Sequence, residues 1–274
     1  MKEILKDSSN DISVIHCNIN PSFGGVNPEP IESNLGELIA KCKKEKVDIG
    51  IATDGDGDRI GAVDSEGRFV TSHHIFSLLL LHLIKNKKQT GEVVKTISST
   101  YLIERIAKKY NLIINETPIG FKYICELMMK KDILIGGEES GGIGFKGHIP
   151  ERDGILSGLY LLEMMAYEKK DLKTLLDELQ DEFGESHYLR EDLLFDGKRR
   201  DELLTRVNKN KTALSPREVK DYDGIKMIFY NDSWLLIRPS GTEPVLRIYA
   251  EAESYEKVKE LIEYGKNLVK DFLL

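Results

Sequence analysis

Hydrophobic positions along the chain follow two spacings in turn, which predicts alternating helices and strands. Leu35, Leu38, Ile39 and Cys42 recur at helical spacing, whereas residues 47–53 form an apolar run of strand length. Similar segments continue to residue 167. Strands are expected at 60–63, 68–70, 93–97, 112–114 and 133–136, and helices at 74–85, 101–110, 121–131 and 155–167. Regular alternation of this kind is typical of layered α/β domains.

The last part of the chain has a different pattern. After a charged segment at residues 168–206, apolar runs at 226–230, 234–238 and 246–250 predict strands, and an amphipathic helix follows. We therefore expect an α/β protein with two mixed α/β layered domains and a smaller α+β C-terminal domain. The expected domains are 1–70, 71–180 and 181–274.

Composition and charge exclude several classes of protein. The chain has 39 basic and 46 acidic residues, a net charge of −7, and no basic run typical of nucleic-acid binding. Its three cysteines are widely spaced, which argues against a disulfide framework and favours a reducing compartment. The N-terminus has no signal-peptide core, and the richest apolar run, residues 76–84, is too short to cross a membrane. We expect a cytoplasmic protein with no nucleic-acid or membrane partner.

The most informative motif is the Asp-Gly-Asp-Gly-Asp-Arg loop at residues 54–59. Carboxylates at alternate positions of a tight loop can turn toward one point, and the glycines permit the curvature. Oxygen ligands at this density favour Mg²⁺, which makes Asp54, Asp56 and Asp58 candidate ligands. Arg59 suits a phosphoryl group that the metal also contacts. A plain acidic surface turn is the alternative, while the residues that follow do not fit an EF-hand.

Other loops carry further polar side chains. The Gly-Glu-Glu-Ser-Gly-Gly loop at 137–142 follows a predicted strand, where α/β sheets commonly bind ligands, and its side chains suit sugar hydroxyls. The Arg-Pro-Ser-Gly-Thr-Glu-Pro loop at 238–244 can hold a phosphate, and Arg247 on the next strand adds a guanidinium. Lys95 and Lys122 are candidates for contact with a phosphoryl oxygen, although most lysines extend into solvent. Taken singly, each loop is also compatible with a structural turn.

In their order along the chain these loops resemble the α-D-phosphohexomutase family, which includes phosphoglucomutase and phosphomannomutase. Members of that family have four domains, which carry in turn a phosphoserine loop, a metal loop, a sugar loop and a phosphate loop. The last three occur here at 54–59, 137–142 and 238–244, and residues 23–30 resemble the stretch before the metal loop. The resemblance covers nearly the whole chain. It implies an Mg²⁺ enzyme that interconverts hexose 1-phosphate and hexose 6-phosphate through a bisphosphate.

The resemblance implies a role for each candidate residue. The metal ligands would be Asp54, Asp56 and Asp58, and the catalytic residues Arg59, Lys95 and Lys122. The substrate-binding residues would be Glu138, Ser140, Arg152, Arg238, Ser240, Gly241, Thr242 and Arg247. Glucose 1,6-bisphosphate would be the activator and intermediate. Glu139 resembles the form of the sugar loop in members that act on glucose phosphates.

One part of the family pattern is missing. The phosphoserine loop, of Thr-Ala-Ser-His-Asn-Pro type, has no counterpart in the 274 residues. The resemblance therefore implies that the first α/β domain here is an incomplete domain 2, that the N-terminal domain is a missing partner, and that the chain alone is inactive. An apolar face left uncovered would favour a homo-oligomer. Two alternatives remain: a non-catalytic Mg²⁺-dependent sugar-phosphate-binding module, and, with less support, a haloacid-dehalogenase-type phosphatase using Asp54 as nucleophile.

Overall fold

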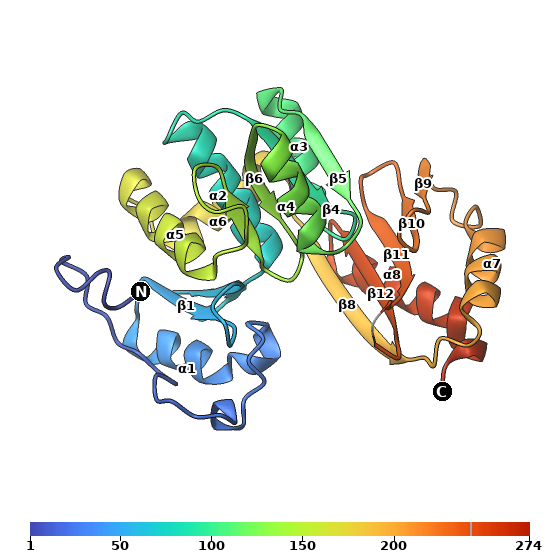
Figure 1. The fold of residues 1–274 in the computed structure, drawn as a ribbon, viewed down its shortest axis with the longest axis horizontal. Coiled ribbons are helices and arrows are strands. Elements are labelled where there is room, and N and C mark those ends of the chain that lie inside the picture. Colours follow the sequence, from blue (N-terminus) through green and yellow to red (C-terminus); the bar gives the residue numbers. More distant parts are fainter. Residues whose placement is uncertain (242) are drawn as a thin grey trace.

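The computed structural model describes residues 1–241 and 243–274, and its three sheets belong to three successive parts of the chain (Figure 1). The N-terminal part ends with a three-stranded antiparallel sheet, in which β2 and β3, near the strands expected at 60–63 and 68–70, form a hairpin. Its elements are η1 (Phe23–Gly25), η2 (Glu32–Asn34), α1 (Gly36–Glu45), β1 (Ile49–Thr53), β2 (Ile60–Asp64) and β3 (Phe69–Val70). The metal loop is the connection between β1 and β2.

The middle part has a four-stranded sheet in the order β5-β4-β6-β7, in which β5, β4 and β6 are parallel and β7 is antiparallel to β6. The strands are β4 (Glu92–Thr96), β5 (Ile114–Thr117), β6 (Ile133–Gly137) and β7 (Ile143–Phe145). The helices are α2 (Ser72–Lys85), α3 (Leu102–Tyr110), α4 (Phe121–Lys130), α5 (Gly154–Glu168) and α6 (Leu172–Phe183). The sugar loop is therefore the turn between antiparallel β6 and β7, a strand that the sequence did not predict.

The C-terminal part is a five-stranded antiparallel sheet in the order β8-β12-β11-β10-β9. Its elements are β8 (His187–Leu194), α7 (Arg200–Asn210), β9 (Glu218–Lys220), β10 (Ile225–Ile228), β11 (Trp234–Pro239), β12 (Val245–Ala252), α8 (Tyr255–Val269) and η3 (Lys270–Phe272). The charged segment at residues 168–206, for which the sequence analysis gave no elements, contains helices and a strand. Within this segment, four leucines of α6 are buried against the middle part, and β8 pairs with β12 along its whole length.

One cluster of buried side chains runs through all three parts of the chain. It includes Ile60 and Ala62 of β2, most of the apolar residues of α2, and Trp234 and Tyr249 of the C-terminal sheet. The expected α/β architecture is confirmed, and the parts share a core. Within the described ranges, no helix is both long and apolar enough to cross a membrane.

A buried carboxylate joins the middle and C-terminal parts. Glu251 on β12 is fully buried and accepts hydrogen bonds from Thr100 Oγ1, the Tyr101 backbone N–H (2.9 Å), Ser186 Oγ (2.5 Å) and Trp234 Nε1 (2.7 Å). A buried charge is costly unless hydrogen bonds replace the lost water. These four donors supply that replacement, so Glu251 fixes how the two parts meet.

Replacing Glu251 with alanine should therefore destabilise the protein strongly. The substitution leaves four buried donors without their acceptor, and we expect the free energy of unfolding to fall by about 3 kcal/mol. Urea unfolding followed by Trp234 fluorescence measures the change. Glu253→Ala is the control, because Glu253 is exposed and accepts one bond from Asn231, and we expect it to cost less than about 0.5 kcal/mol. Equal effects of the two substitutions would contradict this assignment.

Candidate active site

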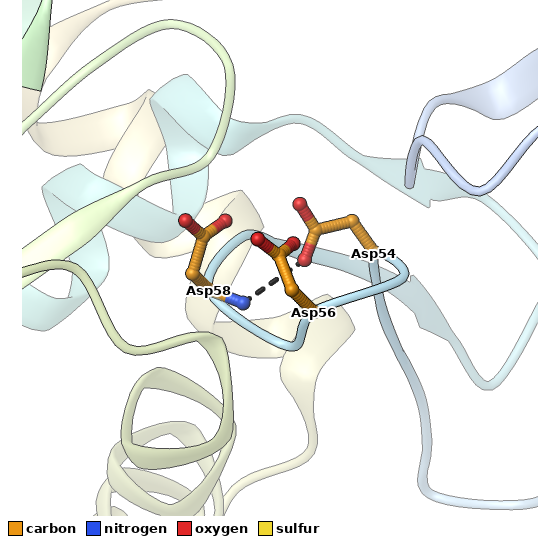
Figure 2. A group of neighbouring side chains, drawn as sticks. All are labelled: Asp54, Asp56 and Asp58. Carbon is orange, nitrogen blue, oxygen red and sulfur yellow. Dashed lines mark hydrogen bonds between the residues drawn. The ribbon is translucent and has the colours of Figure 1, made fainter.

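The acidic loop brings its three aspartates together. Figure 2 shows the side chains of Asp54, Asp56 and Asp58 projecting to the same side of the loop, and one carboxylate oxygen of each lies within 4.8 Å of the others. Asp54 Oδ1 accepts hydrogen bonds from the backbone N–H groups of Asp58 (2.9 Å) and Arg59 (3.1 Å). Its Oδ2 accepts from Arg59 Nε at 2.6 Å. Asp54 therefore holds the loop in shape, whereas Asp56 is exposed.

The aspartates differ in their electrostatic surroundings. Burial raises the pKa of Asp54, but hydrogen bonds from Arg59 outweigh that effect and hold it below its ordinary value. Burial and the neighbouring Asp54 raise the pKa of Asp58, against the opposing charge of Arg152. The buried Asp58 Oδ1 accepts no hydrogen bond within the described residues. Three converging carboxylates, one with an unsatisfied buried oxygen, form a donor set that suits Mg²⁺.

Backbone hydrogen bonds fix the metal loop against the sugar loop. The Ile60 N–H donates to Gly141 O of the sugar loop (3.1 Å), and the Gly154 N–H at the start of α5 donates to Gly57 O of the metal loop (3.0 Å). Gly141 has φ +95°, and a Cβ there would lie 2.5 Å from Ile60 O, so only glycine fits this approach. The two loops, which are far apart in sequence, therefore lie directly against each other.

Arg152, just before α5, links the two loops through its side chain. Its Nε forms an ion pair with Asp58 Oδ2, and its Nη1 donates to Glu138 Oε2 at 3.4 Å. Glu138 Oε1 accepts from the backbone N–H of Gly120 at 3.0 Å. The metal loop, the sugar loop and the loop before α4 thus meet around a single guanidinium.

The residues of the sugar loop divide into two kinds. Glu138 is 5% exposed, and burial together with Glu139 raises its pKa to about 7 despite the charge of Arg152. The Oγ of Ser140 is buried and has no hydrogen-bond partner in the described part of the chain. Glu139 instead turns toward the segment that follows β4, where its Oε2 accepts from Ser98 Oγ at 2.5 Å. Glu138 and Ser140 are available to a ligand, whereas Glu139 anchors the loop.

An open cavity of about 630 Å³ lies beside Glu138. Lys122, Glu138 and Arg152 all line it, together with apolar atoms of Phe121 and Met129. The lining also includes Glu126 and Glu151, so two cations, three carboxylates and a partly apolar wall surround the cavity. The carboxylates suit sugar hydroxyls, and the cations suit an anionic group on the same ligand. The structure therefore brings three of the candidate residues from the sequence to one cavity.

The phosphate loop lies between two inner strands of the C-terminal sheet, β11 and β12, which carry two of its cations. Arg238 on β11 and Arg247 on β12 are direct cross-strand partners. Arg238 Nε donates to Asp223 Oδ1 at 2.7 Å, and Ser240 Oγ accepts from the Glu243 N–H at 3.2 Å. Gly241 is exposed, with open space where a Cβ would lie. The remaining expected phosphate ligand, Thr242, lies outside the described residues.

Lys95 does not belong to this arrangement. It is 1% exposed, its Nζ lies 2.5 Å from Glu104 Oε1 and 3.8 Å from Glu116 Oε2, and it donates to the carbonyl of Thr100 at 3.1 Å. It does not line the cavity of Lys122. The expected contact of Lys95 with a phosphoryl group therefore has no support in the structure, which gives it a buried structural role.

Charged residues outside the motifs connect the metal loop to the phosphate loop. Arg59 Nη1 lies 3.7 Å from Glu29 Oε1, which is 3.9 Å from Arg190 Nη1 on β8. Arg190 Nε donates to Asp192 Oδ1 at 2.7 Å, and Arg247 Nε donates to Asp192 Oδ2 at 3.3 Å. Sequence reasoning included Glu29 only as part of the stretch 23–30 and missed Arg190 and Asp192, because no local pattern marks residues that meet only in the folded chain.

The raised pKa of Glu138 predicts a specific dependence of stability on pH. Its pKa is about 7 in the fold against an ordinary value of 4.5, so the folded state binds more protons between these values. The stabilisation is fully present below about pH 4.5 and is lost as pH rises through 7. Glu138→Gln cannot titrate, so the stability of the wild type relative to this variant should fall by about 2 kcal/mol from pH 5 to pH 8.

Urea unfolding at both pH values measures this difference. Glu126→Gln is the control, because Glu126 is exposed on the same cavity, and it should follow the wild type. If the wild type and Glu138→Gln keep a constant difference from pH 5 to pH 8, the assigned environment of Glu138 is wrong.

Comparison with family models assigns nearly the whole chain. Residues 1–67 match phosphoglucomutase/phosphomannomutase alpha/beta/alpha domain II, and residues 71–183 match alpha/beta/alpha domain III. Residues 202–264 match the C-terminal domain of the same family. The metal, sugar and phosphate loops fall one in each matched domain.

Individual relatives agree with this assignment. A phosphoglucomutase/phosphomannomutase from Thermococcus kodakarensis is 32% identical over 95% of this chain and 56% of its own length. A phosphoglucosamine mutase from Methanocaldococcus jannaschii is 33% identical over 94% of this chain and 57% of its own. A solved structure from Thermus thermophilus, provisionally described as a phosphomannomutase, is 37% identical with a TM-score of 0.83, over 98% of this chain and 57% of its own. The chain spans a little over half the length of these relatives, and it belongs to the α-D-phosphohexomutase family.

Proposed function

We propose that this chain supplies the metal-, sugar- and phosphate-binding parts of a phosphohexomutase that interconverts hexose 1-phosphate and hexose 6-phosphate. The observation that carries the proposal is Arg152, which contacts Asp58 of the metal loop and Glu138 of the sugar loop at once. A substrate held against Glu138 then has one end beside the aspartate cluster. That is the geometry a phosphoryl transfer needs, since such transfers depend on positioning and charge neutralisation.

The donor set described above fits Mg²⁺, held by Asp54, Asp56 and Asp58. When bound, Mg²⁺ would supply positive charge to a phosphoryl group in transfer. Arg59 and Arg152 flank the same cluster and would neutralise further charge on the phosphoryl oxygens.

The other residues would hold the substrate. Glu138 and Ser140 would bind sugar hydroxyls, and Arg238 with Arg247 would grip the phosphate that is not being transferred. Lys122, exposed on the cavity, would approach the same substrate. To return the phosphate at the other carbon, the bisphosphate intermediate would turn end for end between the two sets of cations, with glucose 1,6-bisphosphate as that species for glucose. The phosphoserine of this reaction has no matching loop among the 274 residues and would come from elsewhere in the complete enzyme.

The identity of the sugar is the finer part of the proposal. The Glu139 form of the sugar loop resembles that of members acting on glucose phosphates, and this resemblance alone supports a glucose phosphate. The carboxylate of Glu139 accepts hydrogen bonds from Ser98 and Thr96, so we assign it no contact with the sugar. Relatives named for glucose, mannose and glucosamine phosphates make a hexose or hexosamine phosphate the class we propose.

Two other functions compete with the mutase. In a haloacid-dehalogenase-type phosphatase Asp54 would attack phosphorus, but membership of the mutase family does not favour that reaction. A non-catalytic binding module would use the same loops, so it differs from the mutase only in turnover. Homo-oligomer formation and a cytoplasmic location stay predictions.

Calorimetry on Asp56→Asn tests the metal site within this function. Asp56 is exposed, so its substitution should remove a metal ligand without unfolding the loop. We expect the affinity for Mg²⁺ to fall at least about tenfold, or about 1.4 kcal/mol, with an unchanged urea midpoint. The control is Asp48→Asn, which makes the same charge change at an exposed position before β1. Mg²⁺ affinities equal in Asp56→Asn and Asp48→Asn would contradict the metal assignment.

Turnover separates the mutase from the binding module. With Mg²⁺, glucose 1-phosphate and glucose 1,6-bisphosphate, the chain alone should show negligible activity. Adding the N-terminal fragment of a relative, with its phosphoserine loop, should restore activity only if this chain is a mutase component. Robust activity of the chain alone would overturn the proposed division of labour, and failure of every such fragment would favour the module.

A further inference from the structure

Asp223, a residue that no motif contains, lies between the phosphate loop and the loop that borders the sugar cavity. Its Oδ1 accepts from Arg238 Nε at 2.7 Å, and its Oδ2 accepts from the backbone N–H of Ile119 at 2.8 Å. The side chains of Asp223 and Arg238 are both 14% exposed. We propose that Asp223 is a positioning residue, which orients Arg238 for phosphate binding and couples the phosphate loop to the sugar cavity. This inference rests on the proposed function.

The coupling between the phosphate loop and the sugar cavity depends on the residue that follows Ile119. The next residue, Gly120, lines the cavity and donates its N–H to Glu138 Oε1 at 3.0 Å. Two successive backbone N–H groups therefore point at two carboxylates, one from the C-terminal part and one from the sugar loop. A displacement of Asp223 together with Arg238 would shift the backbone of residues 119–120. It would therefore change the hydrogen bond from Gly120 to Glu138.

Asp223 is itself held firmly enough to act in this way. Just before it, Lys220 Nζ and Tyr222 OH donate to Glu116 Oε1 on β5, at 2.7 and 2.6 Å. Just after it, Gly224 has φ +84°, and a Cβ there would lie 2.8 Å from Arg238 Cβ. The glycine lets the segment approach β11 closely at Arg238. Neighbours on both sides thus define the position of the carboxylate.

The contact leaves Arg238 able to bind a phosphate. A guanidinium has five N–H donors, so a bond through Nε fixes its plane while the two Nη groups carry the other four. Asp223 also brings a negative charge near the phosphate, which opposes binding. We expect positioning to outweigh this repulsion, because an arginine side chain loses much rotamer freedom when it must be ordered by the ligand alone.

The test compares Asp223→Asn with Asp221→Asn in the 274-residue chain. The two substitutions remove the same charge two residues apart, and Asp221 is exposed. With glucose 1-phosphate and Mg²⁺ in a calorimeter, we expect Asp223→Asn to weaken binding about fivefold or more, since a neutral acceptor holds a guanidinium less firmly. Asp223→Ala should weaken it further, and Asp221→Asn should bind as the wild type does.

A second readout separates positioning from a general structural effect. In NMR spectra, inorganic phosphate titrated onto the wild type should shift the amide signals of Ile119 and Gly120, and Asp223→Ala should abolish that response. The urea midpoints of Asp223→Asn and Asp221→Asn should agree. If Asp223→Asn binds as tightly as Asp221→Asn, or if the Ile119 response survives in Asp223→Ala, the inference is overturned. If the wild type binds no glucose 1-phosphate, the proposed function is wrong, and the inference that rests on it is wrong as well.

Discussion

The ion pairs of Arg152 with Asp58 and Glu138 are the contacts on which the rest of the site depends. They bring a metal-binding motif and a sugar-binding motif from different sheets to one guanidinium. Ion pairs that are partly exposed to water contribute little stability, because solvent weakens their attraction, and the side chains of Arg152 and Asp58 are 33% and 20% exposed. Their value here is in orientation: the backbone bond from Ile60 to Gly141 sets the two loops side by side, and Arg152 holds the two carboxylates toward one point.

These ion pairs belong to a larger set of contacts that links the metal, sugar and phosphate loops by two routes. One side runs from Arg152 through Glu138 and the backbone of residues 119–120 to Asp223 and Arg238. The other returns from Arg247, the cross-strand partner of Arg238, through the Asp192, Arg190 and Glu29 series to the metal loop. The arginines that would bind a phosphate are thus held by carboxylates before a phosphate binds. An arriving phosphate can share these guanidiniums without having to order them.

How much the sequence could predict depends on the range of the interactions. The aspartate triplet was predictable because its geometry is set within a short loop, and Glu138 and Ser140 because they follow a clear strand. β7 was missed because three residues are too few for a period, and α6 because its charged face hid its leucines. The sequence could not show that Lys95 is buried and paired with Glu104, because neither burial nor this pairing follows from a local pattern. Asp223 carries no local signal at all, since its partners lie 104 residues before it and 15 residues after it.

The most direct test of this account is a crystal structure of the chain soaked with Mn²⁺ and glucose 1-phosphate, with anomalous scattering locating the metal. The account predicts a manganese peak among Asp54, Asp56 and Asp58, with the sugar against Glu138 and its phosphate on one of the two cation groups, either Arg59 with Arg152 or Arg238 with Arg247. A metal bound elsewhere, or a sugar phosphate on a surface that touches none of these residues, would contradict it.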